Sequence, residues 1–478
     1  MVFIVLSRRN AQINEKFLPM KGLQMAETPS SENKETKPAL VPLSILWPFI
    51  LLTSLFAWWG LANNMTDTLL AAFKRIMSMT DTKTAWIQVV CYFGGYGVIA
   101  FPAAIYIKKF SYKSGVLLGL GLYVLGALSF YPAMLSYAHV PHLTYYFFLL
   151  AIWVLFAGLS FLETAANPYI VTMGPEETGT RRLNLAQSFN PLGSIAGIIV
   201  SQFFILKHLG KATAEDRAAM DSATLEILQT KELNAVTMTY VVVGLILLAT
   251  WIAILLTKTP KVSEEDKRVD FIGTLGRLIR NRHYMWGVVA QFFYVGAQIG
   301  VWSFTIRYVM QELNLQEVAE AAGEGITAES LGNKWYLAGI IIFVLSRFVC
   351  TWLMKFITPG RLLAYLSGIA IVLCCIVAFG GGVVACVALV GISGCMSLMF
   401  PTIFGLAVRG LGNDTKLGGA GVIAAIAGGA VLTQIQGFVS DKTGSINLAY
   451  LVPLVAFVVI AYYGAVACRK DLTVKVAK

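Results

Sequence analysis

The chain has 478 residues, of which 57% are hydrophobic and only 13% charged, and its mean hydropathy is +0.70. Soluble domains carry roughly 25% charged residues, so this composition excludes a soluble domain and indicates a protein that crosses the membrane many times. The formal charge of +11 fits basic loops lying against anionic lipid headgroups. No basic surface interleaved with aromatic residues is apparent, so nucleic acid is not an expected partner.

The N-terminal segment, residues 1–43, differs from the rest of the chain because it contains the polar run AETPSSENKETKP at 26–38. This composition predicts a disordered cytoplasmic tail. No cleavable signal sequence is expected after the short apolar start MVFIVLS, and Met25 is an alternative start position.

After this tail, twelve apolar windows have about the 20-residue length that crosses the hydrocarbon core. They lie near 44–74, 84–107, 114–133, 144–173, 184–206, 235–257, 284–310, 334–356, 361–379, 382–408, 416–439 and 446–468. Little more than Gly380, Gly381 and Gly382 separates two of them, which predicts a tight hairpin. The expected fold is all-α and integral to the membrane.

Charge between the spans sets the orientation. With the N-terminus placed inside, 26 Lys and Arg residues fall in inner segments and 9 in outer loops, and Arg307 and Arg347 lie within spans. The positive-inside rule then places both termini, including the tail 469–478, in the cytoplasm. We expect a multi-pass protein of the plasma (inner) membrane.

The longest inner segment, 258–283, divides the spans into six and six. Within it, Phe271, Leu275, Leu278 and Ile279 recur at helical spacing among arginines, which predicts an amphipathic helix on the membrane surface. The division predicts two pseudo-symmetric bundles, 44–257 and 284–468, as in carriers with a central site at the bundle interface. A channel is less favoured, because no charged ring or repeated filter sequence is present.

Only two acidic residues, Asp67 and Glu163, lie inside long apolar stretches. An ionisable group in hydrocarbon is usually retained for a cavity, a partner or a proton path. A carboxyl that moves between dry and wet surroundings can load and release a proton. The structural alternative is a static ion pair with Arg307 or Arg347.

Polar side chains accompany these acids on helical faces. In span 1, Asn63 and Asn64 lie four and three residues before Asp67, so all three share a helical face. In span 4, Asn167 lies four residues after Glu163 and just before Pro168. In span 5, polar residues follow one another at steps of three, three and four. These residues are Asn63, Asn64, Asn167, Asn184, Gln187, Asn190 and Ser194. Singly, each could serve only helix packing; together they predict a wet cavity that binds substrate.

Span 7 offers a matching stripe in the second half. It comprises Gln291, Tyr294, Gln298 and Trp302, at steps of three, four and four. Aromatic faces pack against the C–H faces of sugars and amides bond their hydroxyls, although ordinary helix packing explains the same stripe.

All four histidines lie in loops or at span ends, and the seven cysteines show no zinc spacing. The sequence therefore favours neither a membrane enzyme nor a metal or other cofactor. The alternatives to a proton-coupled carrier are a sodium-coupled or uncoupled carrier and a non-transporting sugar sensor.

The stretches ANNMTDTLL (62–70), FLETAANPYI (161–170), GPEETGTRRLNLAQSFNPLGS (174–194) and QFFYVGAQIGVWSF (291–304) resemble the fucose/glucose/galactose proton symporters. This is the L-fucose permease branch of the major facilitator superfamily. The resemblance covers essentially all twelve spans. It implies a 6+6 helical carrier that imports a monosaccharide with a proton by alternating access.

The resemblance also implies roles for residues. Asp67 and Glu163 match the family's acids for proton coupling, Gln187 and Asn190 match its polar cavity residues, and Asn63 and Asn64 match its first-span motif. The loop IYIKKFSYKSG lacks the acid of the wider superfamily's signature, so the gating assigned to that loop is not carried over. Four charged residues could either form an inner gate or be ordinary loop charges: Glu176, Glu177, Arg181 and Arg182.

We therefore expect as partners a monosaccharide, a proton and membrane lipid, with no cofactor, and a carrier that functions as a monomer. The sequence leaves the choice among fucose, glucose and galactose open.

Overall fold

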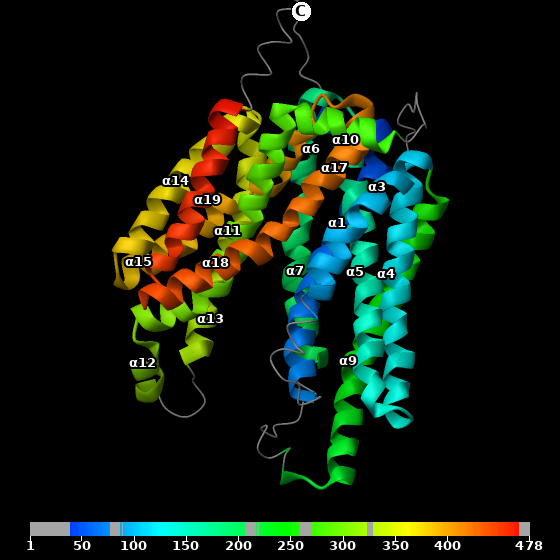
Figure 1. Cartoon of the computed structure of the whole chain (residues 1–478), viewed down its shortest axis with the longest axis vertical. Coiled ribbons are helices and arrows are strands. Elements are labelled where there is room, and N and C mark those ends of the chain that lie inside the picture. The colour runs from blue at the N-terminus through cyan, green and yellow to red at the C-terminus, as the bar shows by residue number, and fades with distance from the viewer. Residues whose placement is uncertain are drawn as a thin grey trace, which may run out of the picture. The chain divides into compact units, whose positions relative to one another are not determined.

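The computed structural model describes residues 39–76, 87, 89–205, 217, 219–258, 270–322 and 328–467, and the regular elements among them are helical (Figure 1). The predicted tails 1–43 and 469–478 lie largely or wholly outside this range, as does most of the first half of the segment 258–283. Side chains of part of α1, including those of Asn63 and Asp67, also lie outside the described residues.

The first bundle contains the helices that precede the long inner segment. They are η1 (Leu43–Ile45), α1 (Leu46–Ile76), the π-helical η2 (Val89–Val98), α3 (Ile99–Lys109), α4 (Tyr112–Leu135), η3 (Ser136–Ala138), α5 (Pro141–Thr172), α6 (Glu176–Gln187), α7 (Phe189–Val200), η4 (Ser201–Ile205) and α9 (Ser222–Leu256).

The linker helix α10 (Phe271–Arg280) leads into the second bundle. That bundle contains α11 (Arg282–Glu312), α12 (Leu315–Ala322), α13 (Ala328–Leu353), α14 (Pro359–Phe379), α15 (Gly382–Met396), α16 (Met399–Ala407), η6 (Gly412–Asp414), α17 (Thr415–Ala424), η7 (Ala425–Ala427), α18 (Gly428–Thr443), η8 (Leu448–Tyr450), α19 (Leu451–Tyr462) and η9 (Tyr463–Ala467).

Eleven helical segments of the described chain are long and apolar enough to cross a membrane. The remaining predicted span, 84–107, lies partly outside the described residues and partly in the continuous helical run of η2 and α3. The predicted hairpin is present: α14 ends at Phe379 and α15 starts at Gly382, whose φ of +61° suits glycine at this reversal.

Two helices begin before the apolar spans that the sequence predicts. The fifth span was expected from 184, but its helix starts at Glu176; the sixth was expected from 235, but α9 starts at Ser222. Both extra segments are polar, so a hydropathy window misses them. Local chemistry explains them, because Glu176 and Glu177 complement the N-terminal dipole of α6 and the Asp221 side chain accepts a hydrogen bond from Thr224 N at the start of α9.

Arg182 supports the extended α6 from inside the protein. Its side chain is fully buried and donates to the Ile170 and Val171 carbonyls at 2.8 and 2.6 Å. These carbonyls belong to the last turn of α5, where acceptors lack intrahelical donors. Arg182 is therefore a cap for α5, which answers one of the roles that the sequence left open.

Close backbone approach holds the helices of the first bundle together. A Cβ on Gly158 of α5 would lie 2.5 Å from the Gly119 carbonyl oxygen of α4, and a Cβ on Gly193 of α7 would lie 1.8 Å from the Ala57 oxygen of α1. Larger side chains at these positions would force the helices apart. The interfaces thus depend on glycine and fix the positions of α5 and α7 around the centre.

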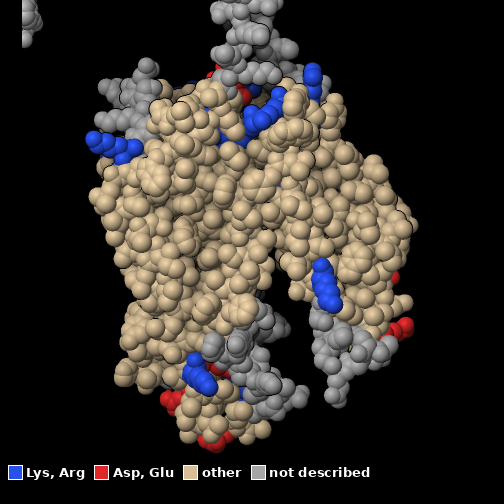
Figure 2. Space-filling view, turned by 180° about the vertical axis from the view of Figure 1, so that it is seen from behind, with Lys and Arg blue, Asp and Glu red and all other residues tan. Residues whose placement is uncertain are grey.

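The two bundles meet at one end, which we call the closed end. Here Arg181 Nε donates to Thr351 O at 3.2 Å, Asn184 Nδ2 donates to Thr402 Oγ1 at 3.0 Å, and Glu176 lies 3.8 Å from Arg409. α6, α10, α17 and the end of α3 gather at this end in Figure 1. At the opposite, open end, Figure 2 shows a hollow between the bundles.

Candidate functional site

A buried line of polar side chains runs from α5 to α6 in the first bundle. Glu163 is 1% exposed and Asn167 is fully buried. Asn167 Nδ2 donates to the Glu163 main-chain oxygen at 3.0 Å, and its Oδ1 accepts from Gln187 Nε2 at 2.7 Å. The predicted acid and two of the predicted amides therefore form one connected group.

The Glu163 carboxyl retains capacity for another partner. Among the described residues, its Oε2 has no hydrogen-bond partner, although the residue is buried. The Tyr96 side chain of η2 lies near this carboxyl. Buried polar atoms normally have partners, so the free oxygen marks a position for a proton, a water molecule or a substrate hydroxyl.

The main-chain oxygen of Gln187 connects this line to the second bundle. The residue four positions on is Pro191, which has no N–H to donate to that oxygen, and the helix is interrupted at Ser188 between α6 and α7. Arg347 of α13 supplies a donor instead, because its Nη1 lies 3.2 Å from Gln187 O. A proline in one bundle thus creates the acceptor that an arginine of the other bundle uses.

Arg347 is buried among groups of the second bundle. Its guanidinium lies 4.8 Å from the centroid of the Phe343 ring, and Tyr294 lies within electrostatic reach. The Nε atom has no hydrogen-bond partner in the described part of the chain. No ion pair joins Glu163 to Arg347 or Arg307 there, and Arg307 lies over the Phe304 ring at 4.3 Å.

The predicted stripe on α11 faces the interior of the second bundle. Tyr294 donates its hydroxyl to Met396 O at 3.1 Å, and Trp302 Nε1 donates to Ser393 Oγ at 3.3 Å. Gln291 is fully buried, and within the described residues neither of its amide atoms has a hydrogen-bond partner. Gln298 is half-buried.

Phe343 connects this stripe to the bundle interface. Its ring lies 5.1 Å from that of Trp302, nearly perpendicular at 72°, and also lies under Arg347. The structure therefore brings Trp302, Phe343, Arg347 and Gln187 into one chain of contacts across the two bundles. Sequence reasoning missed Phe343 and Tyr96, which stand among many other aromatic residues in apolar spans.

The remaining predicted site residues lie on α1 and α7. Asn64 Nδ2 donates to Gly60 O at 3.2 Å within α1. Asn190 is half-buried and lies beyond the interruption at Ser188. Asn63 and Asp67 lie on α1, but their side chains are outside the described residues.

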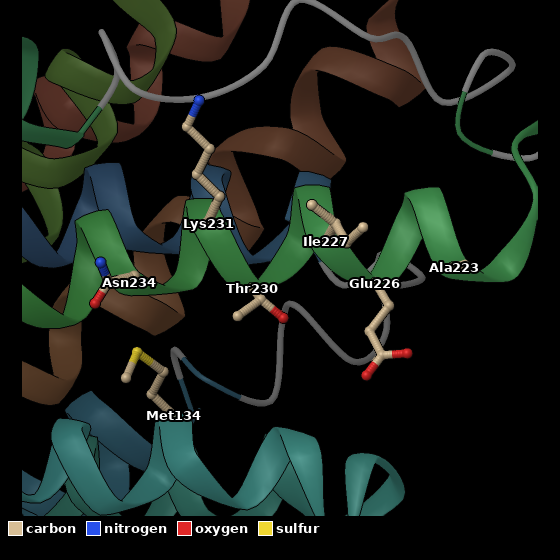
Figure 3. Close-up of a pocket in the computed structure, with 7 residues that line it drawn as sticks. All are labelled: Met134, Ala223, Glu226, Ile227, Thr230, Lys231 and Asn234. Atoms are coloured by element: carbon tan, nitrogen blue, oxygen red, sulfur yellow. The ribbon is translucent and has the colours of Figure 1, made fainter.

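A cavity of about 650 Å³ lies elsewhere, at the open end between the end of α4 and the start of α9. Figure 3 shows Lys231 and Thr230 pointing to different sides of α9, with Met134 opposite on α4. These α9 side chains are exposed. They converge on no common point, so this cavity is not our candidate site.

Two helical bundles that close at one end, open at the other and share buried polar groups at their interface define a membrane carrier. The sequence pattern of the Major Facilitator Superfamily matches residues 49–427. The chain belongs to this family, so the predicted fold class is confirmed and its relatives are transporters rather than enzymes.

Within the family, the chain is 40% identical to the L-fucose-proton symporter of Escherichia coli over 422 residues, which cover 87% of this chain and 92% of the relative. It is 31% identical to the glucose/galactose transporter of Brucella abortus over 418 residues, 87% and 93% of the two chains. The crystal structure of FucP in the outward conformation matches with a TM-score of 0.79 at 38% identity, covering 88% and 99%. The predicted resemblance is confirmed.

Proposed function

We propose that this protein imports a monosaccharide together with a proton by alternating access, with L-fucose as the first substrate to test and glucose and galactose next. The observation that carries the proposal is the buried line Glu163–Asn167–Gln187, which meets Arg347 of the other bundle. Binding at such an interface acts on both bundles at once. The L-fucose-proton symporters and glucose/galactose transporters among its relatives support the substrate class.

In this proposal, Asp67 and Glu163 handle the proton. Sugar hydroxyls and the sugar ring contact a second group, drawn from both bundles. That group is Asn63, Asn64, Asn167, Gln187, Asn190, Gln291, Tyr294, Gln298 and Trp302. A proton on the carrier raises sugar affinity, and by linkage sugar raises proton affinity equally.

The charge distribution orients the carrier. Described basic residues of the inner segments, such as Arg181, Arg277 and Lys416, lie at the closed end, so the positive-inside rule assigns that end and both termini to the cytoplasm. The hollow in Figure 2 then faces outward and gives a sugar access to the centre. We place the protein in the plasma (inner) membrane as a functional monomer, with bundles at 44–257 and 284–468 and tails at 1–43 and 469–478.

No cofactor besides the coupling proton and no nucleic acid takes part in the proposed cycle. Lipid surrounds the apolar faces of the bundles, where exposed side chains such as Leu256 and Phe379 occur.

The test is uptake of a labelled sugar panel into proteoliposomes with an imposed pH gradient, with and without sodium. We expect accumulation that follows the pH gradient and is indifferent to sodium. Accumulation driven only by sodium would show that sodium, not the proton, is the coupling ion. Equilibration without accumulation would indicate an uncoupled carrier. Binding without any transport would indicate a sensor, and no sugar binding at all would overturn the substrate class.

A further inference from the structure

Lys416 joins the two bundles at the closed end. Its Nζ donates to Ile107 O at 3.2 Å and lies 5.0 Å from the centroid of the Tyr112 ring. Lys416 stands in the first turn of α17, whereas Ile107 is near the end of α3. The contact therefore crosses from the second bundle to the first.

The end of α3 is a favourable place for a cation. The last carbonyls of a helix lack intrahelical donors and carry the negative end of the helix dipole. Ser111, which follows the helix, is extended with φ −174° and ψ 167°, and instead caps the start of α4. The Ile107 carbonyl thus remains available to Lys416.

The connection between α3 and α4 has no carboxylate that could pair with Lys416. The segment KKFSYK, residues 108–113, which runs from the end of α3 to the start of α4, contains three lysines and no acidic residue. At the closed end, the cation is therefore Lys416 on α17, and the acceptor is a main-chain oxygen of α3.

The linker helix α10 holds the start of α17. Asp414, immediately before α17, accepts hydrogen bonds from Arg277 Nε and Nη2, each at 2.8 Å. Thr274 Oγ1 also lies 3.3 Å from Asp414 Oδ1 and accepts from Arg277 Nη2 at 2.8 Å. The Asp414 carboxylate raises the pKa of Arg277 above its ordinary value by hydrogen bonding, so the pair stays charged.

α10 also contacts the first bundle. The ring of Phe271 meets that of Phe101 on α3 edge-on, with centroids 6.5 Å apart. On the other side, Leu278 is buried beside α17, where its Cδ2 lies 3.5 Å from the position of a Cβ on Gly418. α10 therefore touches α3 and α17 at the same end of the protein, as its place in Figure 1 shows.

We propose that α10 is a strap across the closed end, in which the Arg277–Asp414 pair holds α17 so that Lys416 caps α3. Opening of this end separates Lys416 from Ile107 and carries α17 away from α3. The strap biases the carrier toward the state that is closed at this end. The proposal rests on the alternating-access part of the proposed function, but not on the identity of the sugar or the ion.

The test measures the distance between the bundles at the closed end without any substrate. Spin labels are placed by Glu177→Cys on α6 and Lys355→Cys after α13, two exposed positions outside the strap. The strap pair is then broken by Arg277→Gln or Asp414→Asn in the full-length protein in lipid. The pair is partly exposed, so we expect the population with the longer distance to rise roughly two- to fivefold.

Arg280→Gln is the matched control, because Arg280 is an exposed arginine on the same helix. It should leave the distance distribution unchanged, and the exchange Arg277→Asp with Asp414→Arg should restore the closed population. Lys416→Met should increase the longer-distance population as Arg277→Gln does. Labelling of the native cysteines is measured on the parent protein, which lacks the two introduced cysteines. Five of its six described cysteines are buried, so we expect this background to be low.

Unchanged distances in both Arg277→Gln and Asp414→Asn, in protein that remains monodisperse, would overturn the strap. An equal shift in Arg280→Gln would overturn it as well, since helix charge in general would then be responsible. A shift in the strap variants together with absent proton-driven sugar uptake in the parent would support the strap and refute only the proposed substrate coupling.

Discussion

The two bundles present different chemistry to the centre of the molecule. In the first bundle, the Asn167 side chain bonds to the main-chain oxygen of Glu163 and to the side chain of Gln187. In the second bundle, Tyr294 bonds to a main-chain oxygen, Trp302 bonds to Ser393, and the Gln291 amide has no partner among the described residues. One side is a connected polar line, and the other is aromatic with isolated polar atoms.

This difference suggests a division of labour. The first side suits a response to a proton, because the buried Glu163 carboxyl, whose Oε2 has no hydrogen-bond partner among the described residues, lies one helical turn from the Asn167–Gln187 pair. An aromatic face with isolated amides is suited to a sugar ring and its hydroxyls. Arg347 is the point of contact between them, since it belongs to the second bundle but bonds to Gln187 of the first.

The largest expected effect comes from Glu163→Gln, which keeps the shape of the side chain but cannot release a proton. We expect pH-driven sugar accumulation to fall on the order of 100-fold, the upper range of coupling between two ligands. Exchange of labelled for unlabelled sugar across the membrane should persist, because exchange needs no net proton movement. Normal accumulation in this variant would remove Glu163 from coupling.

Arg347→Gln breaks the contact between the bundles at the centre. A hydrogen bond from a charged donor contributes about 1.5–3 kcal/mol, so kcat/KM for uptake should fall roughly 10- to 100-fold. Arg307→Gln is the comparison, because Arg307 also lies over an aromatic ring but not at this contact. Equal losses in the two variants would show that general loss of charge, rather than the link to Gln187, is responsible.

Gln291→Leu separates stability from binding. A buried amide without a partner costs about 1–3 kcal/mol, so leucine should raise the melting temperature by a few degrees. If Gln291 bonds a sugar hydroxyl during the cycle, the apparent sugar affinity should fall about tenfold. Gln298→Leu, at a half-buried position, should bring no such stabilisation. A stabilised Gln291→Leu protein with unchanged affinity would assign Gln291 to packing alone.

Pro191→Ala should have the smallest effect. Alanine restores an N–H four residues after Gln187, which competes with Arg347 for the Gln187 oxygen. We expect uptake to fall about threefold, within the contribution of about 0.5–1.5 kcal/mol for one ordinary hydrogen bond. In a protein that already carries Arg347→Gln, Pro191→Ala should not reduce uptake further. If the losses of uptake in the two single variants add in the double variant, Pro191 acts through a contact other than the one between Arg347 and Gln187.

Much of the fold and part of this site followed from the sequence. Apolar windows located the spans, and helical spacing placed Glu163 beside Asn167 because both lie on one helix. The polar start of α6 was missed, since its stability comes from capping and from buried Arg182 rather than from hydropathy. The partner of Arg347 was also missed, because it is a main-chain oxygen 160 residues away, and no side-chain pattern marks a main-chain acceptor.

The most direct test of proton-coupled sugar transport is the external pH of a weakly buffered suspension of proteoliposomes after sugar is added without an imposed gradient. The account predicts a sugar-dependent alkalinisation as protons enter with the sugar, largest for the true substrate and absent in Glu163→Gln. Uptake of the same sugar by the parent protein with no change in external pH would contradict proton symport.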